Sequence, residues 1–312
     1  MQGQVFINMF LLVMLLPLTA CAGSTRLEPT VESAAQGAAG KSSLQSRLDA
    51  AINKERAGAR DARVWTVHSF KVRKGVSVDG ELDPSVKGKV TVRGLHIEMR
   101  SDNPSRNVGL YLLHDLSDGS LEKVEIHDLD RYRAENELPV RMLGAADTGE
   151  SLDVIQRMLE KKPGGQVGER LVMAIGLHDD SQVESLLKSI VNGSYEEKEQ
   201  AQAALWLGQI PGQKSFLEGL ARNEQLSSEV RKQAVVGIGF SQSPGALSTL
   251  RNMFETINDR EIKEQCLFAA SLTEDKRDAA AFLKEVKANS QNPDFRRQAT
   301  IWLDRVEARH DF

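Results

Sequence analysis

Aromatic residues are scarce in this 312-residue chain, and neither sign of charge is in clear excess. Phe, Trp and Tyr together make up 5% of the residues, which argues against a platform that stacks single-stranded bases. Lys and Arg number 40 against 44 Asp and Glu, so the formal net charge of −4 offers little to attract a phosphate backbone. We therefore expect a globular protein with no nucleic-acid partner.

The common sequence motifs of catalysis are also missing. There is no Gly-x-Ser-x-Gly elbow, His-Glu-x-x-His motif, P-loop or dinucleotide fingerprint. Lys162-Pro163-Gly164-Gly165 lacks the Lys-Ser/Thr that completes a phosphate-binding loop. His178-Asp179-Asp180 is the one polar cluster of chemical interest in the C-terminal half, and we interpret it as capping and turn residues. The sequence thus predicts no catalytic residue, no metal site and no cofactor, and it leaves the binding residues unknown.

The N-terminus has the pattern of an export signal. Residues 5–16 are apolar except for Asn8, a length that suits a signal peptide but falls short of the roughly 20 residues of a spanning helix. Leu18-Thr19-Ala20-Cys21 follows and resembles the lipobox of bacterial lipoproteins. The resemblance implies cleavage before Cys21 and attachment of lipid to its sulfur, so that residues 1–21 are signal peptide and lipobox.

Two features qualify this interpretation. No Lys or Arg precedes Arg26, so an ordinary secretory signal and an uncleaved anchor extending to Ala22 stay open as alternatives. Residue 22 is Ala and not Asp, which by analogy with lipoproteins favours the outer membrane, with a periplasm-facing body, over the inner one. If Cys21 is acylated, Cys266, the other cysteine, has no intramolecular disulfide partner.

Residues 22–60 are expected to form a flexible tether with a short helix. Ala, Gly, Ser and Thr dominate residues 22–43, a composition that cannot bury enough apolar surface to offset the entropy of ordering. Leu44, Leu48 and Ile52 then recur at intervals of four, which predicts a helix over 42–57 that attaches loosely to the body.

Residues 61–145 are predicted to form a small β-rich domain. Four segments rich in β-branched and aromatic residues indicate strands, namely 64–72, 90–99, 109–113 and 122–127. Asp79-Gly80 and Asp118-Gly119 mark turns, and the second lies at hairpin distance between two strands. We expect an antiparallel meander that needs a neighbour to be stable.

Histidines are concentrated in this predicted domain. Four of the six lie there: His68, His96, His114 and His127. Their spacing is long and irregular, and no Cys or His-x-His pair accompanies them. We interpret them as scattered strand residues, with a metal site drawn from distant strands as the alternative.

Residues 146–312 contain an internal repeat. Gln202, Gln233, Gln265 and Gln298 each precede a small residue and an apolar run, and successive glutamines are separated by 31, 32 and 33 residues. Each copy places apolar residues at i, i+3 and i+4, which is one face of a helix. A weaker copy covers 172–177, and an additional helix is predicted over 150–161.

A second helix is expected to follow each copy. Its anchors are apolar pairs spaced i, i+3: Leu187 with Ile190, Leu217 with Leu220, Leu250 with Met253, and Leu283 with Val286. Neighbouring helix pairs must stack to bury these faces. Cys266 occupies a small-residue packing position, so we expect a buried thiol and not a nucleophile.

These helices resemble HEAT-like repeats of the short bacterial type. The run from 64 to 302 further resembles secreted bacterial HEAT-repeat proteins with an N-terminal β-rich segment. The segments that carry this resemblance are the Trp65 strand, Leu138-Pro139-Val140-Arg141-Met142-Leu143-Gly144, Ala174-Ile175-Gly176-Leu177-His178, Leu205-Trp206-Leu207-Gly208 and Gly239-Phe240-Ser241-Gln242-Ser243. The predicted fold class is α+β: a small antiparallel β-rich domain followed by a HEAT-like α-solenoid of about four to five helix pairs.

Three functions fit this organisation. The resemblance implies a membrane-tethered envelope scaffold or adaptor that binds a protein or peptide partner through the repeat surface. An envelope enzyme, a lyase or hydrolase with a cleft between the β domain and the first repeats, is the second. A passive structural lipoprotein is the third. We favour the scaffold because the long repeat array carries no catalytic motif.

Overall fold

The structure is a computed structural model that describes residues 42–58, 62–78, 89–92, 95–99, 104–130, 138–241 and 243–308, with the backbone alone for 89–92 and 95–99. Contacts divide the chain into Met1–Ala34 and Ala35–Phe312, and the described residues all belong to the second unit. The predicted signal and lipobox, Cys21, the tether up to residue 41 and the Asp79-Gly80 turn therefore lie outside the described residues.

Helix α1 (Leu44–Gly58) is anchored to the folded body. Leu44 and Leu48 are buried and pack with Leu143 and Val154. The Arg47 guanidinium donates to the backbone carbonyls of Leu143 (2.5 Å) and Ala145 (3.0 Å). The predicted helix is confirmed, but the expected loose attachment is wrong, because its apolar face and this arginine both have partners on the sheet and α2.

The main sheet has four strands in the order β6-β5-β1-β7. Its members are β1 (Arg63–Phe70), β5 (Val108–Asp115), β6 (Leu121–Asp128) and β7 (Val140–Ala145). Strand β5 is antiparallel to both β1 and β6. The β5–β6 hairpin turns at Asp118-Gly119 as predicted, and Gly119 adopts φ +76°, a conformation that glycine reaches without strain.

The expected purely antiparallel sheet is wrong, because β7 runs parallel to β1. Five other strands separate β1 from β7 along the chain, a connection long enough to bring the chain back in the same direction. The register shifts between Val67 and His68, so that Val67 pairs with Met142 and His68 with Gly144. Gly144 has φ +78° at this bulge. The bulge sets the position of His68 opposite α2.

A second sheet of three strands has the order β2-β4-β3, so the segment 90–99 does not belong to the predicted single meander. Its strands are β2 (Val76–Val78), β3 (Lys89–Val92) and β4 (Leu95–Met99). The segment 90–99, predicted as one strand, is thus two strands that pair antiparallel with each other. Strand β2 was not predicted, because three residues are too few to show alternation.

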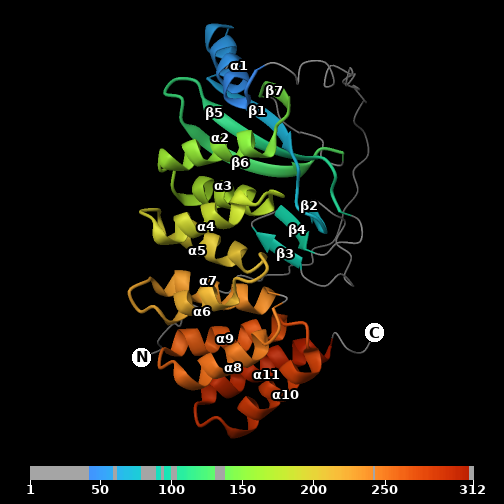
Figure 1. The fold of residues 1–312 in the computed structure, drawn as a ribbon, viewed down its shortest axis with the longest axis vertical. Helices are drawn as coiled ribbons and strands as arrows, with labels where there is room; N and C mark the ends of the chain where they lie inside the picture. Colours follow the sequence, from blue (N-terminus) through green and yellow to red (C-terminus); the bar gives the residue numbers. More distant parts are fainter. Residues whose placement is uncertain are drawn as a thin grey trace, which may run out of the picture. The chain divides into compact units, whose positions relative to one another are not determined.

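The C-terminal part consists of helices, which Figure 1 shows stacked one after another beyond the sheet. They are α2 (Thr148–Glu160), α3 (Gly165–Leu177), α4 (Gln182–Asn192), α5 (Glu197–Leu207), α6 (Lys214–Arg222), α7 (Ser228–Phe240), α8 (Ala246–Thr256), α9 (Arg260–Leu272), α10 (Lys276–Asn289) and α11 (Pro293–Glu307). The structure is therefore α+β. None of the helices in the described residues is both long and apolar enough to cross a membrane.

Local sequence explains where several of these helices begin. Side chains at the N-cap accept hydrogen bonds from backbone N–H groups that have no partner inside the helix. Asp147 does so for α2, Ser227 for α7, Asp259 for α9 and Asn292 for α11. Pro293 then occupies the first turn of α11, where the missing N–H costs nothing.

The odd-numbered helices α3, α5, α7, α9 and α11 contact one another in sequence, and each contacts the even-numbered helix that precedes it. All eight anchors predicted for the second helices are buried. Helix α3 is the most enclosed, since 170–178 are all buried and it also contacts β6. One hydrophobic cluster runs from Phe70 and Ile126 of the sheet to Leu303 of the last helix. The sheet and the helices therefore share a core.

Candidate functional site

The structure brings together two histidines that lie 110 residues apart in sequence. His68 of β1 and His178, which follows α3, both contact Ser151 in the first turns of α2. Ser151 Oγ lies 2.9 Å from His68 Nε2 and 2.8 Å from His178 Nε2. Ser151 is 0% exposed, and each imidazole is 1% exposed. We call these three residues the Ser151 centre.

Hydrogen bonding assigns the protons of the Ser151 centre. His178 Nδ1 lies 2.6 Å from the carbonyl oxygen of Ala174, which can only accept, so Nδ1 carries the proton and Nε2 is an acceptor. Ser151 therefore donates its hydroxyl proton to His178, and its oxygen accepts from His68 Nε2–H. This leaves His68 Nδ1 as a buried acceptor without a partner in the described residues.

Both imidazoles of the Ser151 centre are neutral at physiological pH. Burial, together with the nearby His178 and Arg47, lowers the pKa of His68 to about 3. Burial lowers the pKa of His178 to about 4, although the Ala174 carbonyl and Asp180 act in the opposite direction. The ring of His178 also stacks on Phe70, with centroids 4.1 Å apart and planes 11° from parallel. A charged ring at either position would be poorly solvated.

The chain beside His178 joins the end of β1 to the end of α3. Arg73 N donates to Leu177 O (2.9 Å), and Asp179 N donates to Lys71 O (3.1 Å). The Lys71 ammonium and the Asp179 carboxylate also form an ion pair of 2.8 Å. Asp180 accepts from the backbone N–H of Gln182, as expected of a turn residue. The His178-Asp179-Asp180 cluster therefore fastens the sheet to the helices.

The Ser151–His178 bond has the length of a nucleophile–base pair. A nucleophile must also meet its substrate, and Ser151 is 0% exposed. His178 is oriented by a backbone carbonyl, and His68 occupies the remaining side of the hydroxyl. The geometry therefore supports a polar connection between sheet, α2 and α3. Ser151 was not singled out from the sequence, because its partners lie 83 and 27 residues away and no local motif marks them.

The other predicted histidine positions do not join this centre. His114 Nε2 lies 3.0 Å from Thr66 Oγ1, and burial lowers the pKa of His114 to about 4. His127 pairs with Glu125 at 3.2 Å, and this contact holds the pKa of Glu125 down at about 2. The side chain of His96 lies outside the described residues. Within the described parts of the chain, no group of three or more His, Cys, Asp or Glu side chains is placed to hold a metal ion.

Cys266 lies in α9 and is 0% exposed. Burial raises the pKa of its thiol to about 12, so hardly any thiolate exists near neutral pH.

In a Cys21→Ser variant, where Cys266 is the only cysteine, we expect an aromatic disulfide reagent at pH 8 to react within minutes in denaturant and at least 100-fold more slowly in the folded protein. Equal rates in both conditions would contradict the buried position.

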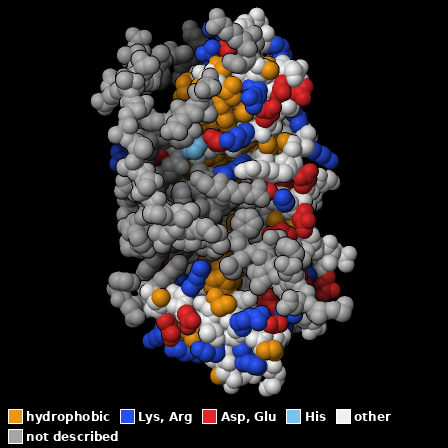
Figure 2. Space-filling model, turned by 180° about the vertical axis from the view of Figure 1, so that it is seen from behind, with side chains coloured by type: hydrophobic (Ala, Val, Ile, Leu, Met, Phe, Trp, Pro, Cys, Tyr) orange, Lys and Arg blue, Asp and Glu red, His pale blue; other side chains and the backbone are white. Residues whose placement is uncertain are grey.

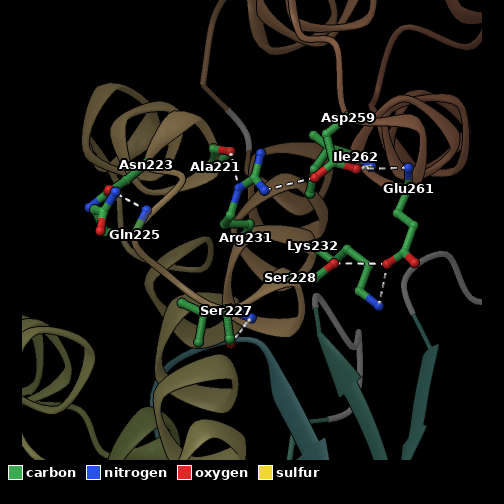
Figure 3. Close-up of polar contacts among 11 residues, drawn as sticks. Ala221, Asn223, Gln225, Ser227, Ser228, Arg231, Lys232, Asp259, Glu261 and Ile262 are labelled. Atoms are coloured by element: carbon green, nitrogen blue, oxygen red, sulfur yellow. Dashed lines mark hydrogen bonds and ion pairs between the residues drawn. The ribbon is translucent and has the colours of Figure 1, made fainter.

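Polar contacts join neighbouring helix pairs across 28 to 34 residues of sequence. Arg231 of α7 reaches Asp259 at the start of α9 (2.7 Å), and its Nε donates to the carbonyl of Ala221 (3.1 Å), as Figure 3 shows. Ser228 donates to Glu261, 33 residues later, and Arg260 of α9 reaches Asp294 of α11, 34 residues later. Successive helix pairs are therefore held in similar relative positions by their N-terminal turns.

The odd-numbered helices also carry matching residues at equivalent positions. Gln202, Gln233, Gln265 and Gln298, one each on α5, α7, α9 and α11, are all partly buried. Three positions further along lie Leu205, Val236, Phe268 and Ile301, of which Ile301 is 44% exposed, Leu205 and Phe268 are partly buried and Val236 is buried. We call these two lines the glutamine row and the apolar row. Acidic and basic side chains are interspersed on the face drawn in Figure 2, with no large area of one sign.

The fold and these sites define an α+β protein in which stacked helix pairs extend from a small mixed sheet. The comparison with protein-family models gave no match, and a search of curated proteins also gave none.

Proposed function

We propose that this chain is a lipid-anchored scaffold of the bacterial envelope whose HEAT-like helices bind a protein partner. The observation that carries the proposal is the stack of odd-numbered helices, on which partly buried glutamines recur at equivalent positions and which ends in the exposed Ile301 of α11. Extended surfaces of stacked helix pairs typically serve for binding. The best-formed polar cluster, the Ser151 centre, is buried and supports the fold. In this proposal, residues 1–21 direct export and lipid attachment, and residues 22–43 form the tether between the lipid and the folded body.

The anchor is tested by replacing Cys21. We expect Cys21→Ser to move the protein from the membrane to the soluble fraction, because two or three acyl chains hold a protein durably and none remains without the thiol. Cys266→Ser is the matched control and should stay in the membrane fraction. Fractionation with immunoblotting measures both. Membrane retention of Cys21→Ser would place the anchor in the apolar segment 5–16.

The binding surface is tested by site-specific crosslinking in intact cells. A photoreactive residue at Ile301, 44% exposed on α11, should give a discrete adduct with one protein. The matched position is Met142, 62% exposed on β7, which should give no adduct with that protein. An adduct at Met142 and none at Ile301 would mean that the sheet, and not the helical surface, meets the partner.

A further inference from the structure

We infer that the joint between the main sheet and the stacked helices is an acid-sensitive device that opens locally. When the pH falls below about 6, the imidazoles of the Ser151 centre take up protons, the sheet and α2 separate from α3, and the helices from α5 to α11 stay folded. The device operates whether or not the helices bind a partner, so it goes beyond the proposed function.

The first support is the place of the Ser151 centre in the fold. Its side chains come from three elements that meet at the joint: His68 from β1, Ser151 from α2 and His178 from the end of α3. The two Nε2 atoms lie 2.9 and 2.8 Å from the one hydroxyl oxygen. Each imidazole is 1% exposed, so a positive ring can be solvated only if these elements move apart.

The second support is the hydrogen bonding of the centre. His178 Nε2 accepts from Ser151, so a proton added at this nitrogen makes two donors face each other. A proton added to His68 goes to Nδ1, which has no partner in the described residues. Two protonated rings on one hydroxyl would also repel each other. Protonation therefore breaks the polar connection between the sheet, α2 and α3.

Charged groups around the centre do not compensate for this. They come from each side of the joint, namely Arg47 of α1, Glu150 of α2, Lys71 and Arg73 after β1, and Asp179 and Asp180 after α3. Arg47 opposes a charge on His68, and Glu150 lies 3.6 Å from that guanidinium. Asp179 is already paired with Lys71 at 2.8 Å. Among these groups, Asp180 alone favours the protonated form of His178.

The third support is the distribution of histidine along the chain. Burial lowers the pKa of His68, His114 and His178, and all three lie in the sheet or at the end of α3. Residues 179–309 contain no histidine, the side chain that ordinarily titrates between about pH 5 and 8. Burial raises the pKa of Glu199 on α5, so its protonation stabilises the folded helices as the pH falls. Acid therefore acts against the joint and not against the helices beyond it.

The stacked helices can remain folded when the joint opens. Units of this kind depend mainly on contacts with their neighbours in the stack. Helices α7, α9 and α11 are joined by Arg231 with Asp259 (2.7 Å) and by Arg260 with Asp294 (2.6 Å), and neither contact involves a histidine. Loss of the sheet removes one neighbour of α3 and leaves these contacts in place.

The experiment follows amide hydrogen exchange of the full chain in detergent at pH 7 and pH 5 by mass spectrometry. After correction for the intrinsic exchange rate, protection of β1 and α2 should fall by about 100-fold or more. The reason is that each imidazole released into water shifts the opening equilibrium by about 30-fold between pH 6.5 and pH 5. Protection of α7 and α9 should change by less than about threefold.

A His68→Gln, His178→Gln double variant tests the trigger. The glutamine amide offers a donor and an acceptor in place of Nε2 but does not titrate, so the effect of pH on β1 protection should be at least about tenfold smaller than in the wild type. Phe70→Leu is the matched control, because it removes the ring stacked on His178 and keeps both imidazoles. It should lower β1 protection at both pH values and leave their ratio as in the wild type.

Three outcomes would overturn the inference. Unchanged protection of β1 at pH 5 would mean that the joint does not open. An equal loss of protection in β1, α7 and α9 would mean that acid unfolds the whole chain. A double variant with the wild-type pH effect would assign the opening to groups outside the Ser151 centre. The first two outcomes are read from the wild-type protein and do not depend on how well the variants fold.

Discussion

Gly239→Ala is expected to lower the thermal midpoint by several degrees, although alanine normally strengthens a helix. The new Cβ would lie 2.5 Å from the Ala269 carbonyl oxygen and 2.9 Å from its Cα. Both are backbone atoms of α9, so α7 and α9 must move apart. Overpacking of this kind costs about 1–3 kcal/mol. In a domain of this size, each kcal/mol corresponds to about 2–4 °C.

Gly219→Ala is the matched control for this prediction. Gly219 is exposed in α6, and a Cβ there would meet nothing within 4 Å. The same substitution should therefore stabilise the protein by about 0.5–1 kcal/mol through helix propensity alone. Thermal unfolding followed by circular dichroism compares the two variants. Midpoint shifts of the same sign would show that α7 and α9 are not in contact at Gly239.

Acid is expected to destabilise the protein well above the range in which most carboxylates titrate. His68, His114 and His178 have folded-state pKa values of about 3, 4 and 4, against about 6.5 in the unfolded chain. Between pH 6.5 and about 4 the unfolded state therefore binds protons that the folded state does not. Stability is fully present above pH 6.5 and falls as the pH drops through this window.

Each buried imidazole contributes on the order of 1.4 kcal/mol per pH unit inside that window. Three of them make the expected loss at pH 5 several kcal/mol, visible as a steep fall in the denaturant midpoint between pH 7 and pH 5. A His178→Asn variant is expected to be less stable at neutral pH. The slope of its free energy of unfolding against pH should be smaller than that of the wild type by the contribution of about one proton. Gln225→Ala is the control, because this exposed side chain has no titratable group and its removal should leave the slope unchanged. A wild-type midpoint that is flat from pH 7 to pH 5 would contradict neutral, buried imidazoles.

The local periodicity of the sequence predicted the helices well and the sheet less completely. Apolar spacing identified Leu187 with Ile190, and the other three pairs, as buried anchors because a helix places i and i+3 on one face whatever its neighbours do. The direction of β7 depends on how the chain returns after β2 to β6, and no short pattern in 140–145 encodes that return. Strand pairing is a long-range property, so the parallel β1–β7 contact could not be predicted locally.

The Ser151 centre was not predicted from the sequence, because it too depends on contacts between residues far apart in the chain. His68 and His178 were both noticed, but as a scattered strand histidine and a capping residue. Their meeting depends on the bulge at Gly144, which sets the position of His68, and on α3 ending beside Lys71 and Arg73. Ser151 itself looks like an ordinary polar residue among Leu152 and Ile155. Buried polar groups satisfied by distant partners leave no local signal.

The position of α3 has a consequence for how copies of this protein interact at high concentration. Stacked helix pairs present an apolar face at each end. If such an end is uncovered, a second molecule can pack on it, and repeated packing gives an open filament. Here β6 lies against α3 and closes one end, while α11 exposes Arg296, Arg297, Asp304 and Arg305 at the other. The sheet therefore serves as a terminus that limits the length of the stack at one end, and the charged side chains of α11 disfavour its continuation at the other.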